Sequence, residues 1–434
     1  MNNSLPEGWK VSTIIDLGRN HKDCVQTGPF GAQLHAEDYV ADGVPLILIK
    51  NIKDSGLDMK GIPRISQEDA NRLKRYQLDE GDIVFSRVGR VGSCFLATEN
   101  EVGWVISGQT LRMRVCDELI DSSYLLYALR SEQVQKDIIG ESVGSTRTSI
   151  NTTILENLEV NVPPLPEQNK IAEILTSVDD VIEKTQAQID KLKDLKTGMM
   201  QELLTRGVGV DGKPYTEFKD SPVGRIPVGW EVRPLGDLAS FVTSGSRGWA
   251  QYYAENGPVF IRIGNLTREH INFRFKDVIH VRPPNSAEGK RTLVQSGDVL
   301  ISITADLGVI AVVNDDIGEA YVNQHVSLVR LKEPKISRWV GHFLSSDDSQ
   351  KQFIANNDAG AKAGLNLTAI RNTQVAIPDL SELELIVEAL DAVDLSISQK
   401  REKLRKISDT KKALMQDLLT GKIRVNVGLK ALVN

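Results

Sequence analysis

The stretch that decides the fold is PPLPEQNKIAEILTSVDDVIEKTQAQIDKLKDLKTGMMQELLT, residues 163–205. It returns 215 positions later as PDLSELELIVEALDAVDLSISQKREKLRKISDTKKALMQDLLT, residues 378–420. Without a gap, fifteen of the thirty-nine pairs between 167–205 and 382–420 are identical. Average residue usage would give about two or three identities by chance. The match therefore indicates one structural unit that the chain uses twice.

Both copies have the hydrophobic spacing of a coiled-coil seam. Apolar residues recur in alternating steps of four and three, as in helices that bury one narrow face against another helix. Prolines precede each copy, and Gly207 and Gly421 follow, which is typical of helix starts and ends. The predicted seam and partner-interface residues are Ile171, Leu175, Val178, Ile182, Ile189, Leu192, Met199 and Leu203 in the first copy, and Ile386, Leu390, Val393, Ile397, Leu404, Ile407, Leu414 and Leu418 in the second.

The length of these helices requires a helical partner. A helix of about forty residues is about 60 Å long at 1.5 Å per residue, too long to bury its seam against one small domain. The other copy is the nearest candidate, and the globular segment between the copies favours an antiparallel pair. The alternative is two amphipathic core helices in two ordinary domains. Lys196 and Lys411 occupy equivalent seam positions, where they could snorkel, set the register or meet a carboxylate on a third helix.

The repeat extends into the segments that precede each helix. Residues 5–11 resemble 226–232, and residues 81–86 resemble 297–302. Both segments alternate β-rich apolar runs with short helical stretches, expected at 68–76, 122–138 and 337–354, so the predicted fold class is α+β with two mixed α/β domains. The expected boundaries are 1–162 for the first domain, 163–221 for the first long helix and a linker, 222–377 for the second domain, and 378–434 for the second long helix and a C-terminal tail.

Composition limits the function classes. The 434 residues leave room for two or three domains, and 52 basic against 58 acidic side chains give a net charge of −6. Any DNA binding must therefore come from local basic loops, because the overall field does not attract nucleic acid. Three cysteines without metal-ligand spacing indicate free thiols in a reducing compartment. Neither a signal peptide nor a membrane span is apparent, so we expect a soluble cytoplasmic protein.

The search for catalytic motifs points away from an enzyme. The sequence has no Gly-x-x-x-x-Gly-Lys-Ser/Thr phosphate loop and no assignable Ser/His/Asp or Cys/His set. Residues 161–165 are only superficially similar to the Asn-Pro-Pro-aromatic motif of adenine methyltransferases, and prolines at a helix boundary explain them better. His325, on a predicted strand, is interpreted as a packing residue. We therefore predict a non-catalytic protein without a metal or cofactor.

Together these features closely resemble the specificity (S) subunits of type I restriction-modification systems. Residues 163–168 open the first helix as in that family, residues 218–224 precede a second matching segment at 226–230, and Leu-Leu-Thr closes both helices. The resemblance covers essentially the whole chain. One departure is the opening of the second helix, Pro378-Asp379-Leu380-Ser381-Glu382, which changes the residues at its N-terminal cap.

The resemblance implies a fold and a function. It implies two target recognition domains in inverted, pseudo-two-fold orientation, held by an antiparallel pair of coiled-coil helices. Each domain would read one half of a bipartite, asymmetric site in double-stranded DNA. The helices would set the spacer and dock two methyltransferase (M) subunits, while nuclease-translocase (R) subunits join the full complex. The helix length of about 60 Å lies between one and two DNA turns of about 34 Å.

Candidate DNA contacts lie in glycine-containing loops where the two halves differ. Base edges and phosphates are bound by Arg, Lys and small polar side chains. The candidates are Arg87, Arg90, Ser145, Thr146 and Arg147 in the first domain, and Ser246, Arg247, Trp249, Lys290, Arg291 and Lys362 in the second. Two other functions compete with DNA recognition. One is methylation or cleavage by this chain itself, and the other is a coiled-coil scaffold that joins two protein-binding domains.

Overall fold

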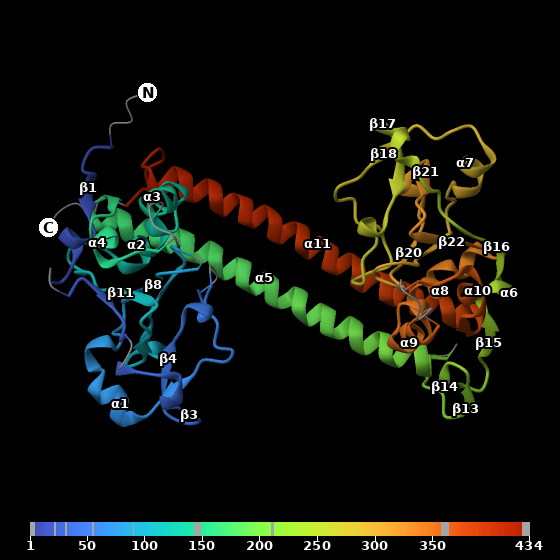
Figure 1. The fold of residues 1–434 in the computed structure, drawn as a ribbon, viewed down its shortest axis with the longest axis horizontal. Coiled ribbons are helices and arrows are strands. Elements are labelled where there is room, and N and C mark those ends of the chain that lie inside the picture. Colours follow the sequence, from blue (N-terminus) through green and yellow to red (C-terminus); the bar gives the residue numbers. More distant parts are fainter. Residues whose placement is uncertain are drawn as a thin grey trace. The chain divides into compact units, whose positions relative to one another are not determined.

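The computed structural model describes residues 5–20, 23–30, 33–53, 56–89, 91–142, 149–209, 212–356 and 364–427. The chain divides into two compact units, one of residues 1–185 with 403–434 and one of residues 186–402. Each unit holds one mixed domain and one half of each long helix (Figure 1). Among the described residues, no helix combines the length and the apolar run that crossing a bilayer requires.

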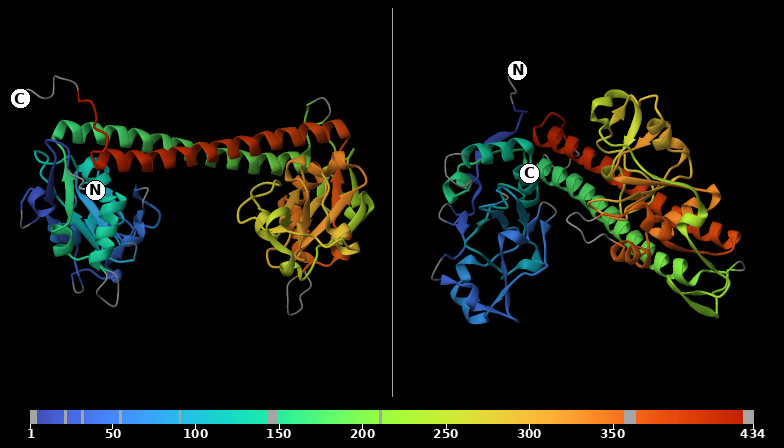
Figure 2. Two further views of the ribbon diagram at one scale, coloured as in Figure 1. Left: turned by 90° about the horizontal axis from the view of Figure 1, so that it is seen from above. Right: turned by 45° about the vertical axis from the view of Figure 1, so that its right-hand side comes forward.

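The two long helices are present as predicted. Helix α5 spans Leu165–Arg206 and α11 spans Leu380–Leu419. In the first unit, Leu175 near the start of α5 shares a core with Leu418 at the end of α11. In the second unit, Leu204 at the end of α5 shares a core with Ile386 near the start of α11. Within each unit the helices are therefore antiparallel, and they lie along one side of the mixed domain (Figure 2).

The burial of the helix faces agrees with the predicted seam. Each of the sixteen seam residues is buried or half-buried, whereas the residues between them are mostly exposed. Two long helices with a narrow apolar stripe thus cover that stripe with each other and with the adjacent domain. The prediction of two mixed domains with long antiparallel helices is confirmed.

The seam lysines form the same ion pair twice. Lys196 Nζ on α5 lies 2.6 Å from Asp394 Oδ1 on α11, with the two side chains only 10% and 3% exposed. In the first unit, Lys411 Nζ on α11 lies 2.6 Å from Asp179 Oδ1 on α5. Both lysines and both aspartates are 215 residues apart, so the pairs are equivalent. Each lysine therefore meets a carboxylate on the other long helix, and a third helix is not needed.

A buried glutamate near the start of α11 fixes the chain that leaves α5. Glu382 accepts hydrogen bonds from the backbone N–H groups of Val208 and Gly209 at 2.8 and 3.0 Å. It also accepts from Tyr215 Oη at 2.8 Å and from Trp230 Nε1 at 3.0 Å. Four donors around one fully buried carboxylate supply the desolvated charge with partners.

The first unit repeats this arrangement near the start of α5. Glu167 accepts from Trp9 Nε1 at 3.2 Å and forms an ion pair with Arg424, which follows α11. In both units, therefore, a glutamate in the first turn of one helix binds the segment that follows the other helix and a tryptophan of the domain.

The first domain is built on a four-stranded antiparallel sheet. Its strand order is β2-β11-β8-β9, and α2 packs against β9 and β12. A smaller sheet has the order β10-β4-β7-β3, and β1 pairs with β12. The strands are β1 Lys10–Thr13, β2 Val25–Thr27, β3 Tyr39–Val40, β4 Val44–Ile47, β5 Ile52–Lys53, β6 Gly56–Leu57, β7 Arg64–Ile65, β8 Ile83–Ser86, β9 Cys94–Leu96, β10 Val105–Ile106, β11 Thr110–Met113 and β12 Glu159–Val162, and the short helices are α1 Gln67–Arg72, α2 Ser122–Leu129, α3 Glu132–Ser142 and α4 Thr152–Glu156.

The second domain repeats this frame. Its main sheet has the equivalent order β16-β22-β19-β20, beside a three-stranded sheet β18-β17-β21. The strands are β13 Phe218–Ser221, β14 Gly224–Pro227, β15 Glu231–Pro234, β16 Ala239–Ser244, β17 Tyr253–Ile261, β18 His280–Val281, β19 Val299–Ser302, β20 Ile310–Val312, β21 Ala320–Val322, β22 Val326–Leu331 and β23 Gln374–Ile377, and the short helices are α6 Leu235–Leu238, α7 Ala287–Thr292, α8 Ser337–Leu344, α9 Asp347–Ala355 and α10 Leu367–Asn372.

Two predicted helices are each broken in two. The stretch 122–138 divides into α2 and α3, and 337–354 divides into α8 and α9. Ser346 caps α9, since its Oγ accepts from the Ser349 N–H, and Ser131 Oγ accepts from the Val134 N–H at the equivalent place. A serine that satisfies the free N–H groups of a new first turn favours a fresh start over continuation of the helix.

We expect that Lys196→Met lowers the free energy of unfolding by about 3–5 kcal/mol, because Asp394 remains as a buried, unpaired charge. Adding Asp394→Leu should restore most of this loss, since the pair is then replaced by apolar side chains. Urea unfolding followed by circular dichroism measures both effects. The matched control is Arg405→Met, which breaks the exposed Arg405–Asp409 pair and should change stability by less than about 1 kcal/mol. Equal midpoints for Lys196→Met and Arg405→Met would contradict a structural role of the buried pair.

Candidate nucleic-acid interface

One end of the main sheet gathers three loop segments in each domain. In the first domain, the Arg87 N–H after β8 donates to the carbonyl of Gln109 before β11 at 3.1 Å, and the Ile150 N–H donates to the Arg87 carbonyl at 2.9 Å. The second domain has the same bonds, from the Ile303 N–H to the His325 carbonyl and from the Leu365 N–H to the Ile303 carbonyl, both at 3.0 Å. The chain that follows 143–148 or 357–363 therefore joins each domain at this sheet end.

A glycine in each domain allows a further segment to pass close to this end. A Cβ on Gly28 would lie 2.2 Å from the Ser107 carbonyl oxygen, and one on Gly245 would lie 2.0 Å from the Asn323 carbonyl oxygen. Only glycine permits so close an approach of two backbones. In the first domain this brings Phe30, 54% exposed, to the sheet end, where the Arg87 guanidinium lies 5.1 Å from its ring centroid.

A loop beside the sheet end is held by the same asparagine in both domains. Asn51 Nδ2 donates to the carbonyls of Asp58 and Lys60 at 3.0 and 3.4 Å. Asn265 Nδ2 donates to the carbonyls of Arg274 and Lys276, each at 3.3 Å. Matching bonds from a buried asparagine show that the two loops share a backbone frame although the side chains on them differ.

In the second domain these segments enclose a cationic hollow. Its volume is about 430 Å³, and three cations line it against a single carboxylate. His325 also lines the hollow, and its Nδ1 lies 2.7 Å from Thr304 Oγ1. We define the cationic hollow by its lining residues, Arg262, Ile263, Gly264, Arg274, Lys276, Asp277, Asn323 and His325.

The sequence alone did not reveal the cationic hollow. The run Arg274-Phe275-Lys276 was a usable signal, because two cations flank an aromatic residue that is 59% exposed. Arg262 and His325 gave no signal of a binding surface, because both adjoin β-rich apolar runs and are therefore predicted to be strand residues. The interpretation of His325 as a packing residue is incomplete: the imidazole is half-buried and reaches the hollow.

The predicted first-domain contacts are only partly described. Arg87 is half-buried at the sheet end, where its Nε donates to the Ile150 carbonyl at 3.1 Å. The other candidates in this domain, and one in the second domain, lie outside the described residues: Arg90, Ser145, Thr146, Arg147 and Lys362.

Two predicted contacts of the second domain are in the interior. Trp249 is 2% exposed and stacks on Phe260 with ring centroids 5.5 Å apart, and Ser246 is fully buried, 3.1 Å from Thr292 Oγ1. Ser246 and Trp249 are core residues although their Gly-Ser-rich context favoured a loop, because burying a large aromatic surface outweighs that context. We therefore do not propose these two as DNA contacts.

The remaining predicted contacts differ in exposure. Arg247 and Lys290 are exposed. Arg291 is half-buried, and its guanidinium donates to the Thr243 hydroxyl and the Ser244 carbonyl. Arg291 therefore connects α7 to β16, which accounts for its position without a ligand.

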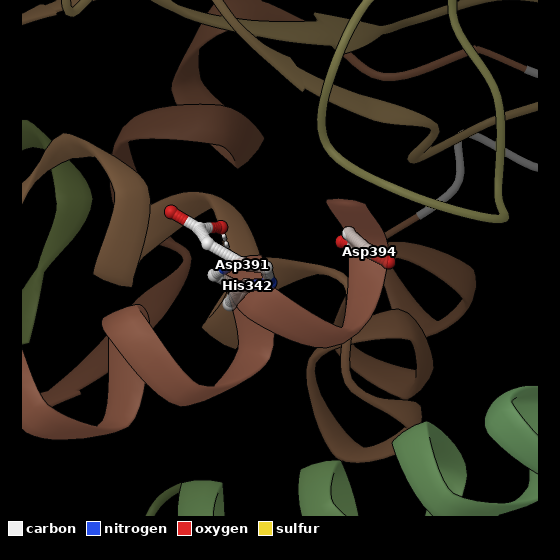
Figure 3. Close-up of side chains that lie close together, drawn as sticks. All are labelled: His342, Asp391 and Asp394. Carbon is white, nitrogen blue, oxygen red and sulfur yellow. Dashed lines mark hydrogen bonds and ion pairs between the residues drawn. The ribbon is translucent and has the colours of Figure 1, made fainter. Parts of the chain in front are cut away.

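A second cluster joins the domain to α11 in the same unit. His342, Asp391 and Asp394 bring ligand-type atoms within 4.8 Å of one another (Figure 3). His342 Nε2 lies 2.8 Å from Asp391 Oδ1, and Arg338 Nη2 donates to the same oxygen at 2.6 Å. Burial raises the pKa of Asp391, but hydrogen bonds from His342 and Arg338 outweigh it and lower that pKa to about 2.

Charge argues against a metal at this cluster. Arg338 already neutralises Asp391, Lys196 neutralises Asp394, and a dication would be repelled by both cations. The equivalent positions in the first unit hold Tyr127, Thr176 and Asp179, with Tyr127 Oη donating to Asp179 Oδ2 at 2.8 Å. Because the repeat builds this joint from a tyrosine and a threonine as well, we interpret the cluster as a structural joint between domain and helix pair.

Each unit also has a groove between a helix end and a corner of its domain. In the first unit a groove of about 940 Å³ lies between the last turns of α11 and the α2–α3 corner. In the second unit a groove of about 600 Å³ lies between the last turns of α5 and the α8–α9 corner. Five lining positions hold identical residues in both grooves, Ser131 and Ser346, Lys136 and Lys351, Met415 and Met200, Gln416 and Gln201, and Thr420 and Thr205.

Comparison with known sequences identifies related proteins. The family described as type I restriction modification DNA specificity domain matches residues 6–194 and 227–408. A putative type I restriction enzyme MjaX specificity subunit of Methanocaldococcus jannaschii is 29% identical over 431 residues, covering 97% of this chain and 95% of that protein. The EcoBI specificity subunit of Escherichia coli is 24% identical, covering 81% and 73%.

Solved structures show the same fold. The type I restriction-modification S subunit of M. genitalium superimposes with a TM-score of 0.59 at 15% identity, covering 96% of this chain and 97% of that one. A chain from a study of complex assembly in a type I restriction-modification system has a TM-score of 0.50 at 15% identity, covering 97% and 100%.

We expect that neither a chelator nor added Zn²⁺ changes the urea midpoint of this protein. A metal held at a hundred times its dissociation constant would stabilise the folded state by about 2.7 kcal/mol, which is easily measured. In contrast, His342→Ala should lower the midpoint, because it leaves a cavity and removes a hydrogen bond to Asp391. A midpoint that rises with Zn²⁺ and loses this response in Asp394→Asn would show that the cluster is a metal site.

Proposed function

The chain belongs to the family of type I restriction modification DNA specificity domains, and on that premise we propose that it is the DNA-recognition subunit of a type I restriction-modification complex. Residues 1–162 and 222–377 would be its target recognition domains. Residues 163–221 and 378–434 would be the helical segments, with a linker and a tail. The subunit itself is non-catalytic, so methyl transfer and cleavage would be performed by its partners.

The observation that carries the proposal is a shared frame with different side chains. Asn51 and Asn265 hold equivalent loops, and Gly28 and Gly245 make equivalent close contacts, so both domains present the same sheet end. The side chains on that end differ between the domains. Base identity is read by side chains placed against groove edges, so two such domains suit a bipartite site with unequal halves.

Arg87 is the best-placed first-domain contact among the described residues. Its Nε is bound to the Ile150 carbonyl and its guanidinium lies over Phe30, so the side chain is oriented before DNA arrives. A guanidinium has five N–H donors, and the remaining ones suit a phosphate or a guanine edge. Arg147 lies outside the described residues and precedes in sequence the segment that joins the domain beside Arg87.

The paired grooves support docking of one kind of partner twice. A surface on which five side chains repeat fits two copies of the same protein better than two unrelated ones. The occupant that the family suggests is the methyltransferase subunit, one in each groove, with nuclease-translocase subunits joining the larger complex. Each groove includes the last turns of a long helix, which agrees with a docking role for the helices.

We expect that Arg87→Ala with Arg147→Ala abolishes recognition of one half-site and leaves the other half-site and the assembly intact. Adenine methylation mapped across the genome of cells that express the chain with its methyltransferase partner measures recognition, and co-elution measures assembly. The control is Arg19→Ala, an exposed arginine beside the Arg114 carbonyl at the other end of the same sheet. An unchanged methylated sequence would refute this placement, and would favour a scaffold if no half-site variant altered it.

We expect that Gln201→Arg and Gln416→Arg each remove one methyltransferase subunit from the complex, and that the double variant removes both. Both glutamines are exposed in their grooves, so an added charge and bulk should block docking without disturbing the core. Native mass spectrometry of the assembled complex counts the subunits. Gln399→Arg, at an exposed position on α11 outside the groove, is the matched control. Two bound subunits in the double variant would show that docking occurs elsewhere.

A further inference from the structure

We infer that the cationic hollow is the surface with which the second domain holds its half of the DNA site, and that His325 reads a base edge there. This inference rests on the proposed function and deepens it, because it assigns residues that the sequence did not single out. The ligand is double-stranded DNA, with phosphates on the cations and a base edge on the imidazole.

The two arginines of the hollow are oriented and keep free donor capacity. Arg262 Nη2 donates to the Asp277 carbonyl at 2.9 Å, and its Nε is buried, so the donors left for a ligand are on the two terminal nitrogens. Arg274 donates from Nε and Nη2 to the Gly264 carbonyl at 3.3 and 3.1 Å. A guanidinium has five N–H groups, so each arginine retains donors for a phosphate oxygen.

The charge of the hollow is strongly local. Three permanent cations, Arg262, Arg274 and Lys276, face one lining carboxylate, Asp277. The chain as a whole carries a net charge of −6. Cations gathered in a recess of an acidic protein are the pattern expected for a phosphate-binding surface, because the attraction to DNA must come from local contacts. Arg274 and Lys276 are exposed, so a duplex can reach them.

His325 is held in a fixed orientation at the edge of this charge. Its ring Nδ1 lies 2.7 Å from Thr304 Oγ1, and its backbone N–H donates to Asn323 Oδ1 at 3.1 Å. Gln324 Nε2 lies 3.0 Å from the other ring nitrogen, so a base edge that binds His325 would take the place of the Gln324 amide. Imidazole and amide groups can exchange hydrogen bonds with base edges, which is what direct readout requires.

The first domain shows that these positions are the ones that vary. On the shared frame, Arg262 corresponds to Leu48, Arg274 to Asp58 and His325 to Gln109, while Lys276 corresponds to Lys60. One cation is kept, and a second is replaced by a carboxylate. The asparagines that hold the loop are unchanged. Side chains that differ on a conserved frame fit a surface on which each domain reads its own sequence.

The test uses the full chain assembled with its methyltransferase partner on a duplex that carries the site mapped for the wild-type complex. Arg274→Ala with Lys276→Ala should weaken binding at least tenfold and reduce the slope of log K against log salt by about 1.8, because about 0.9 is lost for each phosphate contact. His325→Gln, which installs the residue of the first domain, should change or relax the methylated sequence in one half-site only, by about tenfold or more in preference.

Matched variants separate this inference from the proposed function. Lys335→Ala removes an exposed lysine of the same domain that does not line the hollow, and it should leave binding and the salt slope unchanged. Lys276→Ala alone, at an exposed position, provides a test if the double variant folds poorly. Normal affinity, salt slope and methylated sequence in all hollow variants would overturn the inference while the wild-type complex still recognised a split site. If the wild-type complex recognised no split site, the proposed function itself would fail.

Discussion

The interaction on which the rest depends is the lysine–aspartate pair that each unit forms between its two helix halves, buried at Lys196–Asp394 and half-buried at Lys411–Asp179. Burying a charge costs several kcal/mol unless an opposite charge meets it, so Lys196 requires Asp394, and Asp179 meets the smaller need of Lys411. If one helix slipped by a turn, about 5.4 Å, along the other, each pair would separate and both of its charges would lose their partners. The apolar stripe favours association of the helices, whereas the ion pairs select one register. Glu167 and Glu382 then hold the segments that follow the two long helices. Each domain is attached to the helices through Tyr127 in the first unit or His342 in the second.

The attachment of each domain to the helices explains why some residues are the same in both copies of the duplicated unit and others differ. Several positions that touch the helices or hold loops are repeated: the lysine–aspartate pairs, the glutamates and Asn51 with Asn265. A change at any of them would expose a buried charge or an unpaired polar group, which is costly. The side chains at the sheet end do not take part in these pairs. They are free to differ, and Leu48 against Arg262 or Gln109 against His325 show that they do. The two domains therefore differ where a ligand would be read.

Much of the fold follows from the sequence because helix periodicity and duplication are local or one-dimensional signals. The seam, the antiparallel pairing within each unit and the mixed domains were all predictable. The partners of Lys196 and Lys411 could also have been predicted. Asp179 and Asp394 are 215 residues apart, as the two lysines are, so an antiparallel pair can match each lysine with the aspartate of the other helix. Trp249 was not predictable, because only its tertiary neighbours Phe260 and Tyr321 make it a core residue. The cationic hollow was missed for the same reason: Arg262, Arg274 and His325 are brought together by three separate segments.

The overall charge of the chain bears on how such a reader would distinguish sites. A strongly basic protein binds any duplex through phosphate contacts, and its affinity for random sequence is correspondingly high. Here 58 acidic side chains outnumber 52 basic ones, so the non-specific attraction would be weak and cations at each sheet end would carry a larger share of binding. Contacts to base edges would then make up more of the total free energy, which would widen the ratio of specific to non-specific affinity. The cationic hollow has few cations and lies beside the oriented imidazole of His325. This arrangement is consistent with a subunit that recognises a sequence while partner subunits bind the duplex.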